Sequence, residues 1–196
     1  MSPGLLSAGL GSVPAQQTYL DVGQGNRIFD SLYDVELPAL SRDCLSWLSA
    51  VDRRAESAPA EIVPALLTNT LIANGVAVFR EGKSSCAFGG PPGTGDGPVG
   101  IGTMLTAPAS SKTLRTLLGS LHPDDLLIAI EQPPPEKDRA LAIGIAGSGF
   151  DGNLTSDSTR LDGYVLSTDI APTILRHLGV DVPSEMSGQP SGSEIA

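Results

Sequence analysis

Apolar residues recur along the chain in two patterns, one typical of helices and one typical of buried strands. Apolar positions three and four residues apart predict helices at residues 40–55, 61–74, 110–118 and 170–178. Short apolar or β-favouring runs predict strands at residues 19–22, 76–79, 99–105, 126–130, 141–146 and 164–167. Because strands that alternate with helices form βα units, we expect an α/β fold with a mostly parallel sheet sandwiched by helices.

The last of these helices has clear signals at both ends. Asp169 suits the N-cap, because its carboxylate can accept the free N–H groups of the first turn. Pro172 falls in that first turn, where a missing N–H costs nothing. Gly179 is a natural residue just past the helix end, and Pro183 prevents continuation. The pattern predicts a short strand, a helix that starts at Asp169 and a proline-terminated exit.

Length and composition indicate one globular domain. A chain of 196 residues suits a single core, which we place in residues 1–186. Residues 187–196 are predicted to be a disordered tail. Two loops rich in Pro and Gly, residues 89–98 and 132–138, lie between apolar strands of that domain. No run of about 18 apolar residues occurs, so no transmembrane segment is predicted, and no signal peptide is visible.

The charge balance excludes one class of partner. The chain is acidic, with a formal net charge of −10. Nucleic-acid binding needs clustered Lys and Arg to neutralise phosphates, so no nucleic-acid partner is expected. The same balance disfavours docking on anionic membrane surfaces.

The two cysteines do not indicate a cellular compartment for the protein. Neither Cys44 nor Cys86 lies in a CxxC or His-spaced pattern, so no zinc site is predicted. Cys44 falls in a helical run, where it is either a small core residue or one half of a disulfide with Cys86. Both alternatives stay open at this point.

One glycine-rich segment imitates a phosphate-binding loop without its chemistry. Residues 90–95 read GPPGTG, but Asp96, Gly97 and Pro98 follow where the motif needs Lys and then Ser or Thr. An Asp at the Lys position would repel phosphate, so this stretch is interpreted as a turn.

The segment STDIAPTILRHLGVDVPSEMSG, residues 167–188, resembles the C-terminal signature of the alkaline phosphatase superfamily, which includes sulfatases and phosphodiesterases. Coarser similarity, in the right order and closest to uncharacterised bacterial members, extends to residues 4–7, 19–26, 62–76, 125–133 and 141–152. The resemblance implies an alkaline-phosphatase-like fold in which the Asp169 helix is structural. It also hints at a location in the cell envelope or elsewhere outside the cytoplasm.

The chain departs from that family where the metal chemistry belongs. Active members hold two metal ions with several Asp and two or three His, and they attack with Ser, Thr or a modified Cys. Here the only histidines are His122 and His177, and neither matches the family's metal ligands. Residues 131–133 read EQP where the family has DHG, and the first strand with its nucleophile has no counterpart before Gly4. We therefore expect an N-terminally incomplete fold with no metal or other cofactor.

Four polar residues lie where ligands bind in open sheets, beyond the ends of predicted strands. Asp21 and Glu131 follow an early and a later strand, and Asn26 and Arg27 come soon after Asp21. They form one ligand-binding crevice, or the carboxylates simply cap turns.

A second candidate is a dense group of hydroxyls with one cation. Ser156, Ser158 and Arg160 could bind an anion through hydroxyls and guanidinium. The alternative is a solvated loop that hydrogen-bonds to itself.

Two functional hypotheses follow. In the first, the chain is a degenerate or truncated member of the superfamily, a pseudoenzyme that acts as a binding or structural module. In the second, it is the C-terminal portion of a metal-dependent hydrolase of phosphate or sulfate esters, whose nucleophile and first metal ligand lie upstream. Only this second hypothesis calls for zinc, manganese or magnesium. A missing first strand would expose an edge of the sheet, so the first hypothesis also predicts self-association.

Overall fold

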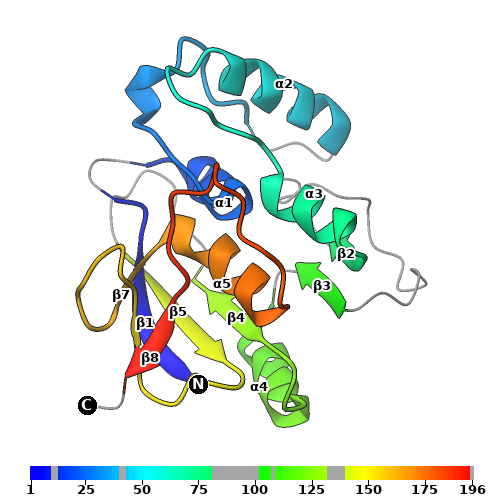
Figure 1. Cartoon of the computed structure of the whole chain (residues 1–196), viewed down its shortest axis with the longest axis vertical. Helices are drawn as coiled ribbons and strands as arrows, with labels where there is room; N and C mark the ends of the chain where they lie inside the picture. Colours follow the sequence, from blue (N-terminus) through cyan, green and yellow to red (C-terminus); the bar gives the residue numbers. More distant parts are fainter. Residues whose placement is uncertain (10–12, 40–42, 81–101, 107–108, 132–139, 195–196) are drawn as a thin grey trace.

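The computed structural model describes residues 1–9, 13–39, 43–80, 102–106, 109–131 and 140–194 (Figure 1). The helices of this part are α1 (Ala15–Gln24), α2 (Cys44–Glu56), α3 (Leu66–Ala73), α4 (Ser111–Ser120) and α5 (Ile170–His177), with 3-10 turns η1 (Asp30–Leu32) and η3 (Ser167–Asp169). The strands are β1 (Ser2–Ser7), β2 (Val76–Arg80), β3 (Gly102–Thr106), β4 (Leu127–Ile130), β5 (Leu141–Ala146), β6 (Asn153–Thr155), β7 (Tyr164–Leu166) and β8 (Gly192–Glu194).

The main sheet has the strand order β4-β5-β1-β7 and is mixed. β1 runs parallel to β7 but antiparallel to β5, and β5 runs antiparallel to β4. The α/β class is therefore confirmed, but a mostly parallel sheet is not. A parallel crossover needs about a dozen residues or more, usually a helix, and residues 131–140 are too few to supply one between β4 and β5. Apolar runs indicate that strands are buried and leave their direction open.

The structure has a strand near the start of the chain that the sequence does not predict. β1 lies inside the main sheet between β5 and β7, although the sequence showed no obvious first strand there. This strand has a weak sequence signal, because its apolar residues are limited to Leu5 and Leu6. They follow Ser2, Pro3 and Gly4, which do not favour a strand. In the described residues the sheet's outer strands are β4 and β7, and self-association stays a prediction.

The predicted strand at residues 19–22 is wrong, because this run belongs to helix α1. Leu20 packs against α2 and Val22 packs against the main sheet, so the helix is buried on two sides and its apolar run imitates a strand. The helix ends at Gly25, which adopts a left-handed conformation (φ 63°) and donates its N–H to the carbonyl of Asp21.

The predicted helices are present, and two of them begin several residues later than predicted. Helix α2 begins at Cys44, because Asp43 caps it by accepting the N–H of Ser46 at 3.3 Å. Helix α3 begins only after Ala65, whose left-handed φ of 55° interrupts the predicted run from residue 61. The predicted strand at residues 99–105 is found as β3, and its residues 99–101 lie outside the described residues.

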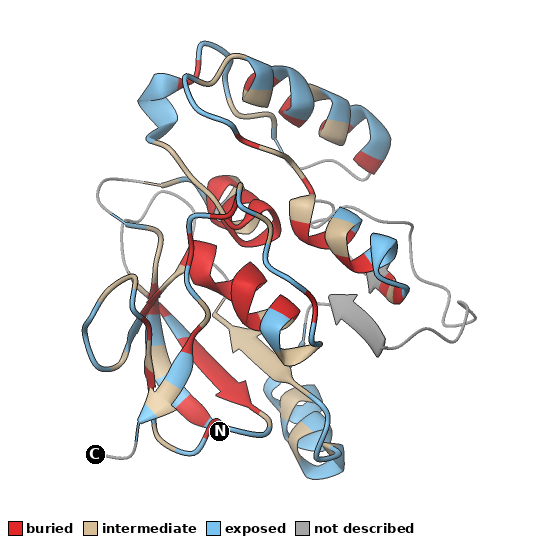
Figure 2. Ribbon diagram, in the orientation of Figure 1, coloured by how far each residue is buried: buried red, intermediate tan, exposed pale blue. Residues whose placement is uncertain are grey.

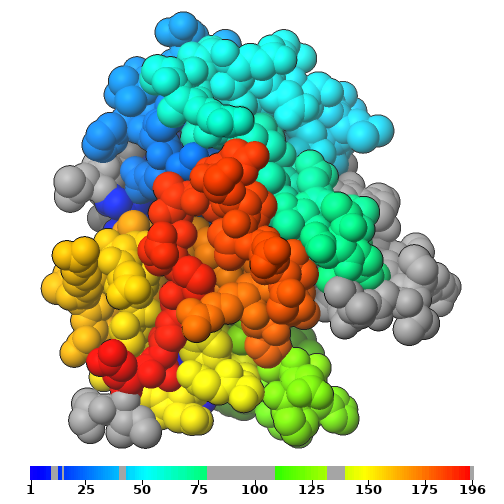
Figure 3. Space-filling model, viewed as in Figure 1, coloured from blue at the N-terminus to red at the C-terminus, as the bar shows by residue number. Residues whose placement is uncertain are grey.

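The predicted disordered tail is ordered over residues 187–194. Gly192–Glu194 form β8, which pairs antiparallel with β6. Upstream of β8, the N–H groups of Ser187 and Gly188 both donate to the carbonyl of Gly25. Figure 3 shows this C-terminal segment, in red, crossing the visible face of the molecule. Its small polar residues are held through backbone bonds to distant segments, which composition does not reveal.

In the described part of the chain, three apolar clusters form the core, and the largest fills the space between the main sheet and helices α1 and α5 (Figure 2). The second joins α3, β2 and α5, and the third joins α1 to α2 around Trp47. On the outer face of the main sheet, by contrast, Leu5, Ala142 and Tyr164 are exposed and lie in one cross-strand row. The predicted helix layer on both faces is therefore not confirmed.

Candidate functional site

The carboxyl ends of the parallel strands β1 and β7 meet at one edge of the main sheet. Leu5, Leu6 and Ser7 pair with Tyr164, Val165 and Leu166, so both strands end side by side. The 3-10 turn η3 follows β7 directly, and α1 packs against it. Because ligands in open sheets bind beyond the carboxyl ends of strands, this edge is the place to look for a site.

Asp21 on α1 is one of two carboxyl groups buried at this edge, and the other is Asp169. Its side chain is fully buried, with Gln17 Nε2 donating to Oδ1 at 2.6 Å and Ser167 Oγ donating to Oδ2 at 3.3 Å. Burial raises the pKa of Asp21 from 3.8 to about 7, although the Gln17 bond, the charge of Arg27, the Ser167 bond and the charge of Arg54 all act to lower it. Asp21 is therefore about half protonated at neutral pH.

Arg54 enters the same region from α2. Only 2% of it is exposed, and its guanidinium carbon lies 3.3 Å from the centroid of the Tyr33 ring. Its Nη2 atom donates to Asp30 Oδ1 at 2.5 Å. Burial also raises the pKa of Tyr33, while the neighbouring Arg54 charge lowers it. A cation, an aromatic ring and two carboxyl groups are thus gathered around the end of α1.

Several buried polar atoms of this region have no described hydrogen-bond partner. Gln17 Oε1, Arg27 Nη1, Tyr33 Oη and Arg54 Nε are buried without a hydrogen-bond partner among the described residues. Such groups are rare in folded proteins, and each calls for an explanation. We name this set the Asp21 cluster, which consists of Gln17, Asp21, Arg27, Tyr33, Arg54 and Ser167.

Four members of this cluster were missed in the sequence. Helix α1 carries Gln17, Asp21 and Gln24 at helical spacing. This spacing was not recognised because residues 19–22 were predicted to form a strand. Arg54 looked like a solvated residue near a helix end, which is the usual place of an arginine. Ser167 was seen only as the end of a strand.

The predicted crevice is assembled in part. Arg27 does lie near Asp21, and its guanidinium packs so closely on Gly9 that a side chain at Gly9 would overlap it. Glu131 is engaged elsewhere, in the pairing of β4 with β5, where its Oε2 atom accepts the N–H of Ala142 at 3.1 Å. The described interactions of Asp21 do not include Glu131.

Asn26 links three segments of the fold. Its side-chain nitrogen donates to the carbonyl oxygens of Glu61 (3.2 Å) and Glu185 (2.9 Å). Its side-chain oxygen accepts from Arg27 N and Ser187 Oγ, both at 2.8 Å. The amide is fully occupied within the protein, so Asn26 positions loops and leaves no group for a ligand.

The predicted hydroxyl site holds an internal carboxylate. Ser156 Oγ and Ser158 Oγ donate to the two oxygens of the buried Asp169 carboxylate at 2.7 and 2.6 Å. The N–H groups of Leu166 and Gln189 add bonds of 2.9 and 3.0 Å. We name these five residues the Asp169 cluster. Asp169 thus caps the turn η3 that precedes α5, which corrects the prediction that it caps the first turn of the helix itself.

Arg160 does not join the Asp169 cluster through any described side-chain bond. It is exposed, has a left-handed φ of 53°, and donates its backbone N–H to the carbonyl of Ser156 at 2.9 Å. The loop hydrogen-bonds to itself and to Asp169, as the alternative interpretation of this segment proposed.

The histidines and acidic residues are dispersed. Among the described residues, no three His, Cys, Asp or Glu side chains are grouped so that they could hold a metal ion. His177 Nε2 lies 2.9 Å from the carbonyl oxygen of Asp124, and the N–H of His122 donates to Asp125. Cys44 is disulfide-bonded, and the other cysteine of the chain, Cys86, lies outside the described residues. In the described part of the chain, the helices are too short or too polar to cross a membrane.

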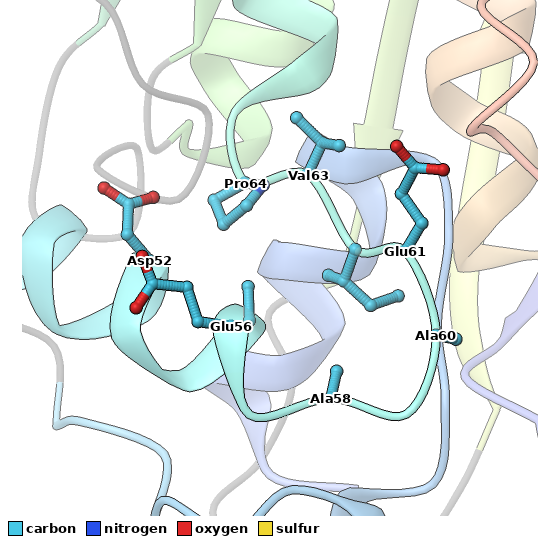
Figure 4. A pocket seen from close by; sticks show the side chains of 9 residues that line it. Asp52, Glu56, Ala58, Ala60, Glu61, Val63 and Pro64 are labelled. Atoms are coloured by element: carbon cyan, nitrogen blue, oxygen red, sulfur yellow. The ribbon is translucent and has the colours of Figure 1, made fainter.

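A shallow groove of about 580 Å³ lies between the end of α2 and residues 58–64 (Figure 4). Its acidic lining residues are Asp52, Glu56 and Glu61. Burial, and then the nearby charge of Glu56, raise the pKa of Asp52. Figure 4 shows Asp52 and Glu56 on one side and Glu61 on the other, so the three carboxyl groups do not converge on one point.

No family model, no curated protein and no solved structure matches this chain. The resemblance to the alkaline phosphatase superfamily therefore stays a prediction.

Proposed function

We propose that this chain is a non-catalytic binding or structural module with an alkaline-phosphatase-like architecture. The observation that carries the proposal is the burial of Asp21, the carboxyl group at the paired ends of β1 and β7. A metal ligand must be ionised and a general base must reach its substrate. Asp21 has no exposed surface, so it cannot reach a substrate, and its raised pKa disfavours the ionised form that a metal ligand needs.

The remaining polar candidates support the same proposal. Asp169 accepts four hydrogen bonds from the protein, and Asn26 uses both ends of its amide to join loops. Glu131 is engaged in the pairing of β4 with β5. These polar side chains thus support the packing of this fold.

One observation favours the second hypothesis, in which the chain is the C-terminal portion of a metal-dependent phosphate- or sulfate-ester hydrolase. Leu5, Ala142 and Tyr164 form an exposed row on the outer face of the main sheet, whereas α1 and α5 cover the inner face. In the mostly parallel α/β fold that the resemblance implies, helices cover both faces of the sheet. A further segment that packs here could also supply a nucleophile and metal ligands.

Thermal unfolding with and without zinc, manganese and magnesium distinguishes the two hypotheses. A site saturated at about 100 times its Kd would stabilise the fold by about 2.7 kcal/mol. For a domain of this size that is roughly 5–10 °C in Tm. We expect no metal-dependent shift and no hydrolysis of phosphate or sulfate esters. A shift of that order that a chelator abolishes and that Asp21→Asn removes would contradict the non-catalytic proposal.

The disulfide of Cys44 supports a location outside the cytoplasm, because disulfides persist mainly in oxidising compartments. We expect neither of the chain's two cysteines to react with an alkylating reagent in denaturant without a reductant, and both to react after reduction. Mass spectrometry of the natively isolated protein measures this directly. Two reactive thiols before reduction would contradict the proposed location.

A further inference from the structure

The guanidinium groups of the half-buried Arg27 and the buried Arg54 lie near Asp21, and neither has a described hydrogen bond to it. Arg27 and Arg54 both act on its carboxyl group electrostatically. Arg27 Nη1 and Arg54 Nε are each buried without a hydrogen-bond partner among the described residues. A buried donor left without an acceptor costs about 1–3 kcal/mol. Two unused donors therefore stand next to a carboxyl group that accepts only one short bond.

The two guanidinium groups are not equally free to move toward Asp21. Arg54 is stacked on the Tyr33 ring and bonded to Asp30, so two contacts hold its position. Among the described residues, the Arg27 guanidinium packs closely on Gly9, while its backbone is anchored through the side chain of Asn26. Of the two guanidinium groups, that of Arg27 is therefore the less restrained.

We propose that the Asp21 cluster is a proton-linked switch, in which loss of the Asp21 proton to solvent draws the Arg27 guanidinium onto the carboxylate. The bond that forms is a hydrogen bond from Arg27 Nη1–H to a carboxylate oxygen of Asp21, and the Asp21 proton passes to solvent. Because Asp21 also accepts from Ser167, the ion pair tightens α1 against η3. This inference does not depend on whether the chain hydrolyses a substrate.

The range in which the switch acts follows from its surroundings. Burial places the pKa of Asp21 at about 7, so both states are populated near neutral pH. Below about pH 7, desolvation favours the protonated form of Asp21. Above about pH 7, the ionised Asp21 pairs with Arg27.

The other elements packed on Asp21 bring few competing charges. From the segment after α1 come Arg27, Asp30 and Tyr33, and from α2 comes Arg54. Helix α3 has no titratable residue, and the η3 carboxylate, Asp169, is bonded to Ser156 and Ser158. Helix α5 carries its basic residues, Arg176 and His177, only in its last turn.

Trp47 provides the readout, because it is the only tryptophan in the chain and packs in one cluster with Leu20, the neighbour of Asp21. We expect the tryptophan fluorescence of the full chain to follow a one-proton transition with a midpoint near pH 7 in a titration from pH 5 to pH 9. Asp21→Asn abolishes the transition. His122 and His177 are unchanged in that variant, so it is also the control for a contribution from either histidine.

Substitutions of Arg27 test the pairing itself and leave Asp21 intact. Arg27→Gln should raise the midpoint by about one pH unit, because an opposite charge nearby lowers a carboxyl pKa by about 1–3 units. Arg27→Lys, which keeps the charge, should raise it less. A wild-type protein without a transition, a transition that survives in Asp21→Asn, or a midpoint that Arg27→Gln leaves unchanged would each overturn the proposal. If Asp21→Asn does not fold, the two Arg27 variants decide the matter alone.

Discussion

Asp21 and Asp169 are both fully buried carboxyl groups at the same edge of the main sheet, yet their surroundings differ. Asp169 accepts four hydrogen bonds of 2.6–3.0 Å, divided between its two oxygens. Asp21 accepts one bond of 2.6 Å and a second of 3.3 Å. Donors offset the cost of burying a carboxylate, so their number decides what the group contributes. The Asp169 cluster stabilises the fold, whereas the Asp21 cluster makes its stability depend on pH.

The largest expected effect is that of Asp169→Ala. The substitution leaves two hydroxyls and two backbone N–H groups without their acceptor, and we expect a loss on the order of 4 kcal/mol in the free energy of unfolding. Urea unfolding at pH 7 measures it. Asp157→Ala, at an exposed carboxylate of the same loop, is the matched control and should cost no more than about 0.5 kcal/mol. A loss below about 1 kcal/mol for Asp169→Ala would contradict the account of this cluster.

Asp21 should produce a pH-dependent loss of nearly the same size. Its pKa is raised in the fold, from 3.8 to about 7, so its contribution is complete below pH 3.8 and is lost as pH rises toward 7. The difference corresponds to about 4 kcal/mol between pH 4 and pH 7. Asp21→Asn should remove this slope and leave the other groups unchanged. Urea unfolding across this pH range measures the free energy of unfolding of the wild type and of Asp21→Asn. The same dependence on pH in both proteins would exclude a raised pKa at Asp21.

A smaller effect tests how the C-terminal segment is held near Asp169. A Cβ atom at Gly188 would meet the backbone carbonyl of Thr168, while at Gly192 it would meet nothing within 4 Å. We expect Gly188→Ala to cost about 2 kcal/mol and Gly192→Ala less than about 1 kcal/mol. Thermal unfolding of the two variants makes the comparison. Equal effects would show that residues 187–191 are not docked against η3.

The smallest expected effect is that of Asp30→Asn. Asp30 pairs with the buried Arg54, but 48% of the Asp30 side chain is exposed and solvent screens the pair. Pairs with such exposure contribute about 1 kcal/mol or less. We expect a loss within that limit by urea unfolding, since the Tyr33 stack still holds Arg54. A loss above about 2 kcal/mol would make the ion pair, instead of the stack, the main support of Arg54.

The sequence predicts the elements whose signals are local. Helix α5 was found from its apolar stripe and from Gly179 and Pro183 beyond its end, and β4 and β5 from their apolar runs. Helix α1 was missed because Leu20 and Val22 are buried on different sides, so the run has no single apolar face. Strand direction in the main sheet and the pairing of β8 depend on long-range contacts, which no local pattern encodes.

The candidate site was predicted only in part for the same reason. Asp21 and Arg27 were named because they followed a supposed strand, and they do lie together, although on a helix and the segment after it. Arg54 reaches them from another helix across the core, and nothing in its local sequence distinguishes it from a solvated arginine. Ser156 and Ser158 were recognised as a hydroxyl group, but their acceptor, Asp169, is brought near only by the fold.

The ionisation of Asp21 is the central claim, and side-chain carboxyl ¹³C NMR of the aspartate-labelled chain tests it most directly. The Asp21 resonance, assigned as the one missing in Asp21→Asn, should titrate with a midpoint of about 7. A midpoint below about 5, close to the ordinary aspartate value, would mean that donors stabilise Asp21 as an anion and would contradict both the pH-dependent stability and the switch.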